Sequence, residues 1–165
     1  MRSSQIEVLS SPSDYYLALH KLIKQSTRRI SMSALYLGTG KLELFLLDRI
    51  SKKLTTASDL DCKILLDYMR GTREETMKGS NERASSFSLL SDLKMKHYAH
   101  DSLRIGFYHN PDTGMLKGAV FPGPYREIFG VHHIKAHVFD DNVLFTGANL
   151  TDHYFTMCQD RYFIV

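Results

Sequence analysis

The sequence predicts an α/β fold, and three observations point to it. Short apolar runs that suit strands alternate with longer segments whose apolar residues recur at helical spacing. Most of the expected strands are separated by an expected helix, which favours a layer of parallel strands. The chain has 165 residues, enough for a sizeable core, so residues 1–165 are expected to form a single domain.

The first part of the chain follows this alternation closely. A short apolar strand is expected at residues 6–9, and residues 11–14 supply capping oxygens and an early proline for a helix that starts near Tyr15. The next expected elements are a strand at 29–36, a helix with an apolar stripe at 42–55 and a buried strand at 61–67.

The later part of the chain is less regular. Residues 71–85 are rich in Gly, Thr, Ser and mixed charge, which is typical of a loop. The segment 110–126 is predicted to be a long irregular loop whose apolar residues either form a lid or lipid contact, or fold inward. The remaining expected elements are a helix at 86–97, a strand at 103–108, a hairpin at 131–145 and a strand from 161.

Composition restricts the function classes only a little. The formal charge of +3 gives no reason to expect nucleic-acid binding, although a mildly basic surface suits phosphorylated substrates and anionic lipid headgroups. Cys62 and Cys158 lack metal-ligand spacing and fit a reducing compartment. No apolar run is long enough to span a bilayer, so a lipid enzyme built this way should lie on the membrane. Residues 1–5 show neither a secretory segment nor an Arg-rich leader.

The most informative string runs from His133 through Lys135 to Asp140 and is followed by a Gly-Ala-Asn turn that ends at Asn149. Side chains of a strand alternate between two faces, so His133 and Lys135 are expected on one face, with the intervening apolar residues 134, 136 and 138 toward a core. A neutral imidazole can attack phosphorus, and a neighbouring ammonium can hold the phosphoryl oxygens. A bare His-x-Lys triplet is more often an ordinary half-exposed strand, but the full string favours chemistry.

This His-x-Lys-x4-Asp string resembles the motif of the phospholipase D superfamily, whose members transfer phosphoryl groups through a covalent phosphohistidine. Within that superfamily the chain resembles the eukaryotic phosphatidylglycerophosphate synthases over nearly its whole length. The strings that carry this likeness are residues 10–13 (SSPS), 33–40 (SALYLGTG), 65–71 (LLDYMRG), 147–152 (GANLTD) and 159–162 (QDRY). Family members have two such motifs, whereas this chain has one and is similar to their first half.

The resemblance implies a phospholipase D-like layered α/β/α sandwich with a mixed, largely parallel sheet. It also implies a phosphatidyltransferase that acts on CDP-diacylglycerol and glycerol 3-phosphate in phosphatidylglycerol and cardiolipin synthesis, peripherally at the mitochondrial inner membrane. A second motif would come from another half or from a homodimer partner. Two alternatives stay open: a homodimeric single-motif phosphodiesterase that uses water, and a truncated half without activity.

The resemblance also assigns roles to individual residues. His133 would be the nucleophile, Lys135 would stabilise the equatorial oxygens and Asn149 would donate to the same oxygens. Asp140 would be the carboxylate that orients an imidazole, either its own or that of the second motif, with Asp141 as a competitor. The phosphohistidine chemistry requires no cofactor.

Four further features are candidates of less specific kind. Arg70 lies at the carboxyl end of an expected strand, where it would contact the phosphate of glycerol 3-phosphate or form a surface ion pair. His137 shares the face of His133 and would line the pocket, whereas His132 is expected to be structural or exposed. The loop Gly38, Thr39 and Gly40 is either a nucleotide or phosphate cradle at a helix N-terminus or a plain tight turn. The histidine spacings predict no metal site.

Overall fold

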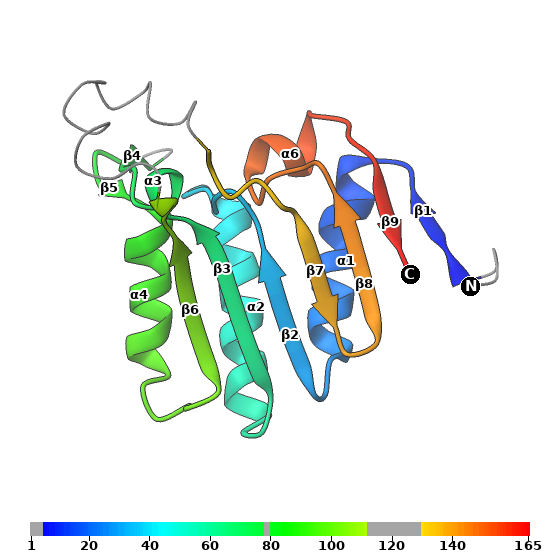
Figure 1. Cartoon of the computed structure of the whole chain (residues 1–165), viewed down its shortest axis with the longest axis horizontal. Helices are drawn as coiled ribbons and strands as arrows, with labels where there is room; N and C mark the ends of the chain where they lie inside the picture. Colours follow the sequence, from blue (N-terminus) through cyan, green and yellow to red (C-terminus); the bar gives the residue numbers. More distant parts are fainter. Residues whose placement is uncertain (1–4, 78–79, 112–129) are drawn as a thin grey trace.

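The structure is a computed structural model that describes residues 5–77, 80–111 and 130–165. A seven-stranded sheet in the order β1-β9-β8-β7-β2-β3-β6 forms the centre of the molecule (Figure 1). Its strands are β1 (Glu7–Leu9), β2 (Arg29–Ser33), β3 (Asp61–Asp67), β6 (Leu103–Tyr108), β7 (Ala136–Phe139), β8 (Asn142–Thr146) and β9 (Tyr162–Ile164). The helices are α1 (Pro12–Gln25), α2 (Lys41–Thr56), α3 (Tyr68–Gly71), α4 (Ser86–Lys96) and α6 (Asp152–Thr156). The α/β class is therefore confirmed.

The sheet is mixed, but parallel pairing is confined to one side. β2, β3 and β6 pair in parallel, because α2 connects the first two strands and α4 lies between the last two along the chain. The other four neighbouring pairs are antiparallel. A tight turn at Asp140 and Asp141 joins β7 to β8 and reverses the chain direction. The sheet is thus mixed, as expected. The expectation that it is largely parallel holds for the pairs β2–β3 and β3–β6 and does not hold for the other four pairs.

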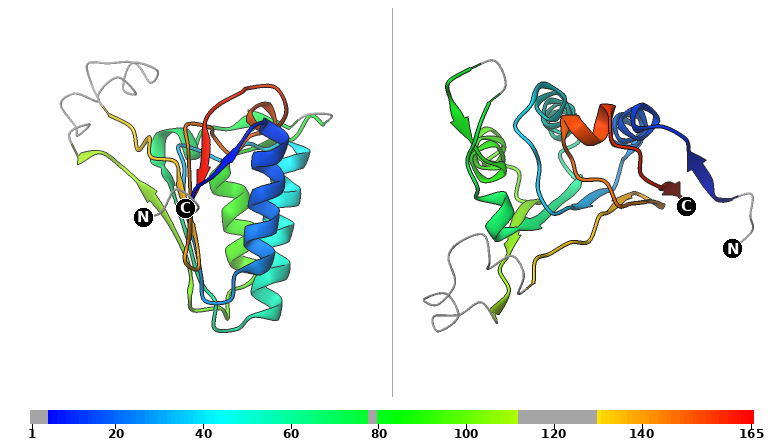
Figure 2. Two further views of the ribbon diagram at one scale, coloured as in Figure 1. Left: turned by 90° about the vertical axis from the view of Figure 1, so that its right-hand side faces the viewer. Right: turned by 90° about the horizontal axis from the view of Figure 1, so that it is seen from above.

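The three long helices lie on one face of the sheet. Figure 2 shows α1, α2 and α4 side by side in a single layer behind the strands. Within the described residues, the expected layered sandwich is thus represented by the sheet and one layer of long helices. The reason is that each crossover through α1, α2 and α4 passes over the same side. The opposite face leaves large apolar side chains partly exposed, among them Leu65, Phe145 and Phe163.

The core lies between the sheet and the helix layer. β2 and β3 bury alternate side chains, with Ile30, Met32, Cys62 and Ile64 against the helices, so the strand predicted to be buried at 61–67 is buried mainly on one face. Burial of such side chains contributes about 1.5–3 kcal/mol each relative to exposure. Tyr15 of α1 is fully buried and stacks on the ring of Tyr162 from β9 at 4.8 Å between centroids. This contact fastens the first helix to the last strand.

Element boundaries follow from local hydrogen bonds. The Ser11 side chain caps α1 by accepting from the Asp14 N–H at 3.1 Å, so the helix begins at Pro12 rather than near Tyr15. Ser85 and Ser88 form a capping box that starts α4. The predicted loop 71–85 contains the small hairpin of β4 (Glu75–Thr76) and β5 (Arg83–Ala84). The predicted irregular loop 110–126 lies outside the described residues except for residues 110 and 111.

Within residues 5–77, 80–111 and 130–165, no helix combines the length and the apolar character that a membrane crossing needs.

Candidate active site

His133 and Lys135 meet beside the carboxyl ends of the parallel strands. The Lys135 Nζ lies 2.9 Å from Nε2 and 3.1 Å from Nδ1 of His133. The lysine side chain is buried, with 6% of its residue surface exposed, whereas His133 is exposed. The pair therefore presents an accessible imidazole with an ammonium held directly behind it.

The electrostatics keep this imidazole neutral. Burial lowers the pKa of His133, and the neighbouring Lys135 ammonium and His132 lower it further. Burial also lowers the pKa of Lys135, while the Asp160 carboxylate opposes that change. A neutral imidazole keeps a lone pair for attack, so the arrangement favours His133 as a nucleophile at neutral pH.

The two faces of β7 are reversed relative to the sequence prediction. Ile134 is 62% exposed and Ala136 and Val138 are half-buried on the uncovered face, whereas His137 is completely buried on the helix-covered face. The expectation that residues 134, 136 and 138 face the core is therefore corrected. The helices cover only one face of the sheet, and β7 turns Lys135 and His137 toward it.

His137 lies in the core and does not line an open pocket. Its Nε2 is 3.4 Å from the hydroxyl oxygen of Tyr15, and Nδ1 has no hydrogen-bond partner among the described residues. Burial lowers the pKa of His137 to about 4, so the ring is neutral. The predicted role of His137 as a pocket residue is corrected to one of packing beneath the site.

Asp160 is a residue to which the sequence reasoning assigned no role. Its carboxylate opposes the lowering of the Lys135 pKa and lies against the Gly147 backbone. A Cβ at Gly147 would stand 2.7 Å from both carboxylate oxygens, so glycine is the residue that permits this approach. The string QDRY at residues 159–162 was the available signal, since it carried part of the family likeness.

Asn149 occupies the turn after β8, next to the isolated bridge between Leu37 and Leu150. It is 7% exposed, and its Oδ1 has no hydrogen-bond partner among the described residues. A buried carboxamide held in a turn beside the strand ends is suited to contact a polar substrate group. The prediction that Asn149 binds phosphoryl oxygens stays a prediction that this position supports.

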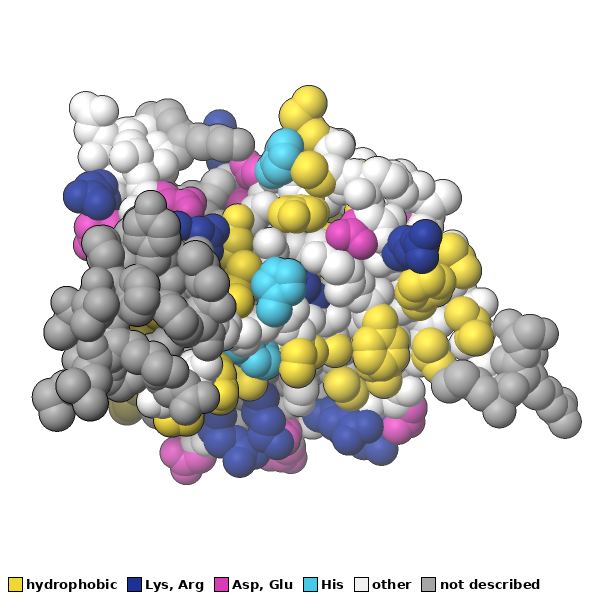
Figure 3. Space-filling model, turned by 45° about the horizontal axis from the view of Figure 1, so that its top comes forward, with side chains coloured by type: hydrophobic (Ala, Val, Ile, Leu, Met, Phe, Trp, Pro, Cys, Tyr) yellow, Lys and Arg dark blue, Asp and Glu magenta, His cyan; other side chains and the backbone are white. Residues whose placement is uncertain are grey.

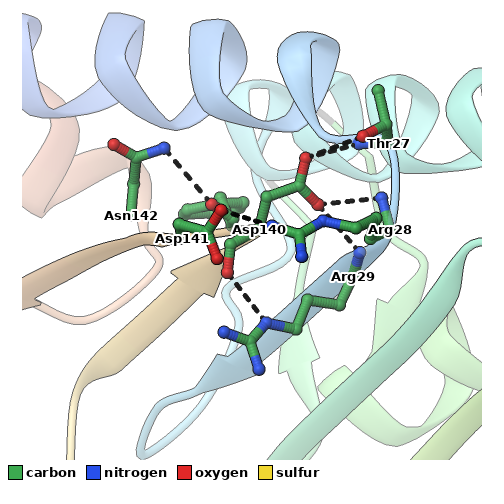
Figure 4. A network of polar contacts seen from close by, with 7 residues as sticks. Thr27, Arg28, Arg29, Asp140, Asp141 and Asn142 are labelled. Atoms are coloured by element: carbon green, nitrogen blue, oxygen red, sulfur yellow. Dashed lines mark hydrogen bonds and ion pairs between the residues drawn. The ribbon is translucent and has the colours of Figure 1, made fainter.

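Asp140 lies at the opposite end of β7 from His133. The two positions are seven residue steps apart along an extended chain, roughly 20 Å at the rise of a strand. Figure 4 shows its carboxylate turned toward the segment that connects α1 to β2. Oδ2 accepts from the backbone N–H of Thr27 at 2.8 Å and its hydroxyl at 3.0 Å, and Oδ1 accepts from the N–H groups of Arg28 at 2.8 Å and Arg29 at 2.9 Å.

These bonds define what Asp140 does in this chain. Burial by itself would raise the pKa of the Asp140 carboxyl, but the N–H donors hold this pKa well below its ordinary range. Asp140 also has a positive φ of 51°, as required by the tight turn, and Asp141 forms an ion pair with Arg28. The prediction that Asp140 orients its own imidazole is therefore corrected, because within this chain the carboxylate fastens the turn and does not meet His133. A role toward the imidazole of a second motif stays a prediction.

Arg70 lies in α3, directly after β3. Its guanidinium carbon is 4.6 Å from the centroid of the Tyr36 ring, a cation–π contact, and its backbone N–H donates to Asp67 at 2.9 Å. Arg70 is thus at the same edge of the sheet as His133, where α/β proteins bind ligands. A phosphate contact by Arg70 stays a prediction.

The Gly38–Gly40 loop encloses two carboxyl groups. Glu43 is 2% exposed and accepts from the Asp152 N–H at 2.6 Å, and Asp152 accepts from the Leu42 N–H at 3.0 Å. A Cβ on either glycine would collide with these carboxyl oxygens, at 2.2 Å for Gly38 and 2.4 Å for Gly40. The N-terminus of α2 already holds an anion from the chain itself. This favours the tight-turn interpretation over a phosphate or nucleotide at Gly38, Thr39 and Gly40, which stays untested.

Comparison with known proteins places these features in a family. No protein-family model matches the chain. The CDP-diacylglycerol–glycerol-3-phosphate 3-phosphatidyltransferase of Cricetulus griseus is 39% identical over 166 residues, and the probable enzyme of that name from Dictyostelium discoideum is 38% identical over 162. These alignments cover 97% and 98% of the chain but only 28% and 27% of the relatives. The chain therefore spans less than a third of their length.

Solved structures show the same fold. The phosphatidylserine synthase of Haemophilus influenzae superimposes with a TM-score of 0.79 at 26% identity, over all of this chain and 34% of that one. Nuc from Salmonella typhimurium, a phospholipase D family member, superimposes with a TM-score of 0.64 at 16% identity and shows the fold alone. The chain thus shares its fold with both of these structures.

Proposed function

Since the chain belongs to the phospholipase D superfamily and is a homologue of the CDP-diacylglycerol–glycerol-3-phosphate 3-phosphatidyltransferases, we propose that it provides the nucleophilic half of such an active site. The donor would be CDP-diacylglycerol and the acceptor glycerol 3-phosphate. The observation that carries this proposal is the exposed, neutral imidazole of His133 with the Lys135 ammonium 2.9 Å from it.

The reaction has two steps in which each bond made replaces a bond broken. A ring nitrogen of His133 attacks the phosphatidyl phosphorus, the P–N bond forms and the P–O bond to CMP breaks. The 1-hydroxyl of glycerol 3-phosphate then attacks the same phosphorus, and the P–N bond breaks. Lys135 and Asn149 hold the equatorial oxygens as their negative charge grows. Asp160 stabilises the charged form of Lys135.

This scheme needs a second acid–base group. CMP must receive a proton as it leaves, and the acceptor hydroxyl must lose one. In the proposal a second histidine performs both transfers and comes either from another copy of this chain or from the further length that the relatives have. Mixing wild type with a His133→Gln variant distinguishes the homodimer from the two-motif chain. Only in the homodimer should the rate fall faster than the fraction of wild-type protein in the mixture.

The proposed place of action is the surface of a mitochondrial membrane. The names of several relatives include the word mitochondrial. In the space-filling view a band of hydrophobic side chains crosses the visible face, with histidine side chains beside it (Figure 3). Ile134, next to the nucleophile in sequence, is 62% exposed. Apolar surface beside a site for a lipid substrate supports peripheral contact with a bilayer.

The test is a phosphatidyl-transfer assay with two acceptors. The protein is incubated with detergent micelles of CDP-diacylglycerol labelled in the phosphatidyl phosphate, with glycerol 3-phosphate or with buffer alone, and quenched in alkali to preserve a phosphoramidate. We expect labelled phosphatidylglycerophosphate and continued release of CMP only with glycerol 3-phosphate. With buffer alone we expect at most one CMP for each site, together with label on the peptide that contains His133. Undiminished turnover in His133→Gln would overturn the mechanism. Equal release of phosphatidic acid with or without acceptor would favour the phosphodiesterase alternative.

A further inference from the structure

Three polar side chains converge on the residues that flank the nucleophile. Ser33 is the last residue of β2 and Asp67 the last of β3, and both reach the segment 132–134. The backbone N–H of His132 donates to the Asp67 Oδ2 at 2.9 Å. The His132 Nε2 lies 2.6 Å from the Ser33 Oγ, and that Oγ is 3.2 Å from the carbonyl oxygen of Ile134. Peptide groups on both sides of His133 are therefore tied to the sheet.

The proton positions in this network follow from its donors and acceptors. The carbonyl of Ile134 can only accept, so the single hydroxyl proton of Ser33 points to it. The Ser33 oxygen must then accept from His132, which places a proton on Nε2. Burial lowers the pKa of His132, with the Asp67 carboxylate opposing and the Lys135 ammonium assisting, and this fits a neutral ring with that tautomer.

Asp67 connects the network to the neighbouring strand. It is 2% exposed, and its two carboxylate oxygens accept from two different backbone N–H groups, Oδ1 from Arg70 and Oδ2 from His132. Its own N–H donates to the carbonyl of Leu35 at 3.1 Å. The buried carboxylate thus ties the start of α3 to the segment before the nucleophile, and the backbone N–H of the same residue ties both to the loop after β2.

This segment has few other means of being held. β7 starts at Ala136, so residues 132–134 lie outside the strand ladder. A chain without ladder hydrogen bonds keeps its conformational freedom unless side chains restrain it. An attacking atom displaced by about 1 Å costs on the order of 100-fold in rate. A site that depends on His133 therefore needs a restraint at both of its peptide neighbours.

We propose that Ser33, Asp67 and His132 are positioning residues that clamp the peptide groups on either side of His133 and so aim its imidazole. This clamp rests on the proposed function only in the sense that His133 is the nucleophile. The hydrogen bonds themselves exist whether or not the substrate is a phosphatidyl donor.

Matched pairs of variants test the clamp through activity. Ser33→Ala removes both hydroxyl bonds, whereas Ser33→Thr keeps them on a residue that suits a strand. His132→Leu removes the ring donor, whereas His132→Gln places an amide donor near the position of Nε2. We expect kcat to fall about 10- to 100-fold in Ser33→Ala and His132→Leu, with KM changed less than about threefold. Ser33→Thr and His132→Gln should stay within about threefold of wild type in kcat.

Asp67→Asn tests whether the clamp needs both carboxylate oxygens of Asp67 as hydrogen-bond acceptors. An amide offers one acceptor oxygen to two N–H donors, so one bond is lost while the shape is kept. The expected kcat loss is again about tenfold or more. Thermal unfolding of every variant separates a misplaced imidazole from an unfolded chain.

A measurement without substrate separates this proposal from the proposed function. Nitrogen-15 NMR of labelled histidines in the chain should show His132 neutral and protonated on Nε2 in wild type, and a mixture of tautomers in Ser33→Ala. If wild type lacks phosphatidyl transfer but shows this signature, the proposed function fails and the clamp stands. The clamp is overturned if His132 carries its proton on Nδ1, or if Ser33→Ala and Ser33→Thr have equal kcat.

Discussion

Replacing Asp140 tests directly whether the third residue of the motif is structural. Asp140→Asn keeps the shape of the side chain and one acceptor oxygen, and asparagine tolerates the left-handed backbone at φ 51°. Asp140→Ala removes all four hydrogen bonds from Thr27, Arg28 and Arg29. The two variants therefore differ in a way that the structure specifies.

The magnitude follows from the number of bonds and their exposure. The donors lie close to solvent, so water partly replaces the carboxylate, and we take the lower part of the usual net value, about 0.5–1 kcal/mol for each bond. Four bonds then give about 2–4 kcal/mol for Asp140→Ala. Asn loses about half of the bonds, roughly 1–2 kcal/mol. At about 2–4 °C per kcal/mol for a chain of this size, Asp140→Asn should lower Tm by roughly 2–8 °C and Asp140→Ala by roughly 4–16 °C.

The pH dependence has a definite sign. The folded pKa of Asp140 is lowered, so its stabilisation is present above the unfolded value of about 3.9 and is lost as pH falls through the folded pKa. Wild type and Asp140→Asn should therefore differ most in free energy of unfolding at neutral pH and converge in acid. Denaturant titrations at neutral pH and in acid below about pH 3 measure this difference.

The assay must also distinguish structure from chemistry. Activity is measured well below the Tm of each variant, where both should be folded. A structural Asp140 predicts that Asp140→Asn retains activity within a few fold while its Tm falls. An Asp140→Asn variant with an unchanged Tm and a kcat reduced by two orders of magnitude or more would refute the reasoning, since that pattern belongs to a residue that acts on the reacting groups.

Three further predictions concern the surroundings of the site. Burial and the hydrogen bond with Asp152 raise the pKa of Glu43 to about 8. The stabilisation from the protonated Glu43 is therefore fully present below the unfolded carboxyl pKa and is lost as pH rises toward 8. Glu43→Gln should flatten the dependence of Tm on pH from about 5 to 9. Gly147→Ala should displace the Asp160 carboxylate and lower kcat about tenfold, with an unchanged rate pointing to a freely moving aspartate. Lys135→Met should lower kcat about 100-fold or more, whereas a change in KM alone would assign the lysine to ground-state binding.

Much of the fold could be predicted because its signals are local. Buried strands, capped helices and the alternation of Ile30 and Met32 depend on residues close together in sequence. The choice of which face the helices cover is not local. It depends on the handedness of several crossovers and decided whether Ile134 or Lys135 would point toward the core. The period of two was correct and the assignment of its faces was wrong for this reason.

The site was predictable where the chemistry resides in one short segment. His133 and Lys135 are two residues apart, and a single strand face brings them together. The clamp and the counter-charge could not be found in this way. Ser33, Asp67 and Asp160 approach the nucleophile from three other strands or their loops, so their partnership appears only when the sheet order is known.

The case of Asp140 shows what the spacing of the motif measures. Lys135 and Asp140 are five residues apart because β7 runs from Ala136 to Phe139 between them. One end of this strand presents the imidazole at the carboxyl edge of the parallel strands, and the other end is fastened by the carboxylate to the segment before β2. In this chain the motif is thus a strand together with its anchor, and we expect its aspartate to act on the nucleophile by fixing the register that brings Lys135 to the site. Removing one residue from β7 would turn either the lysine or the anchor to the wrong face.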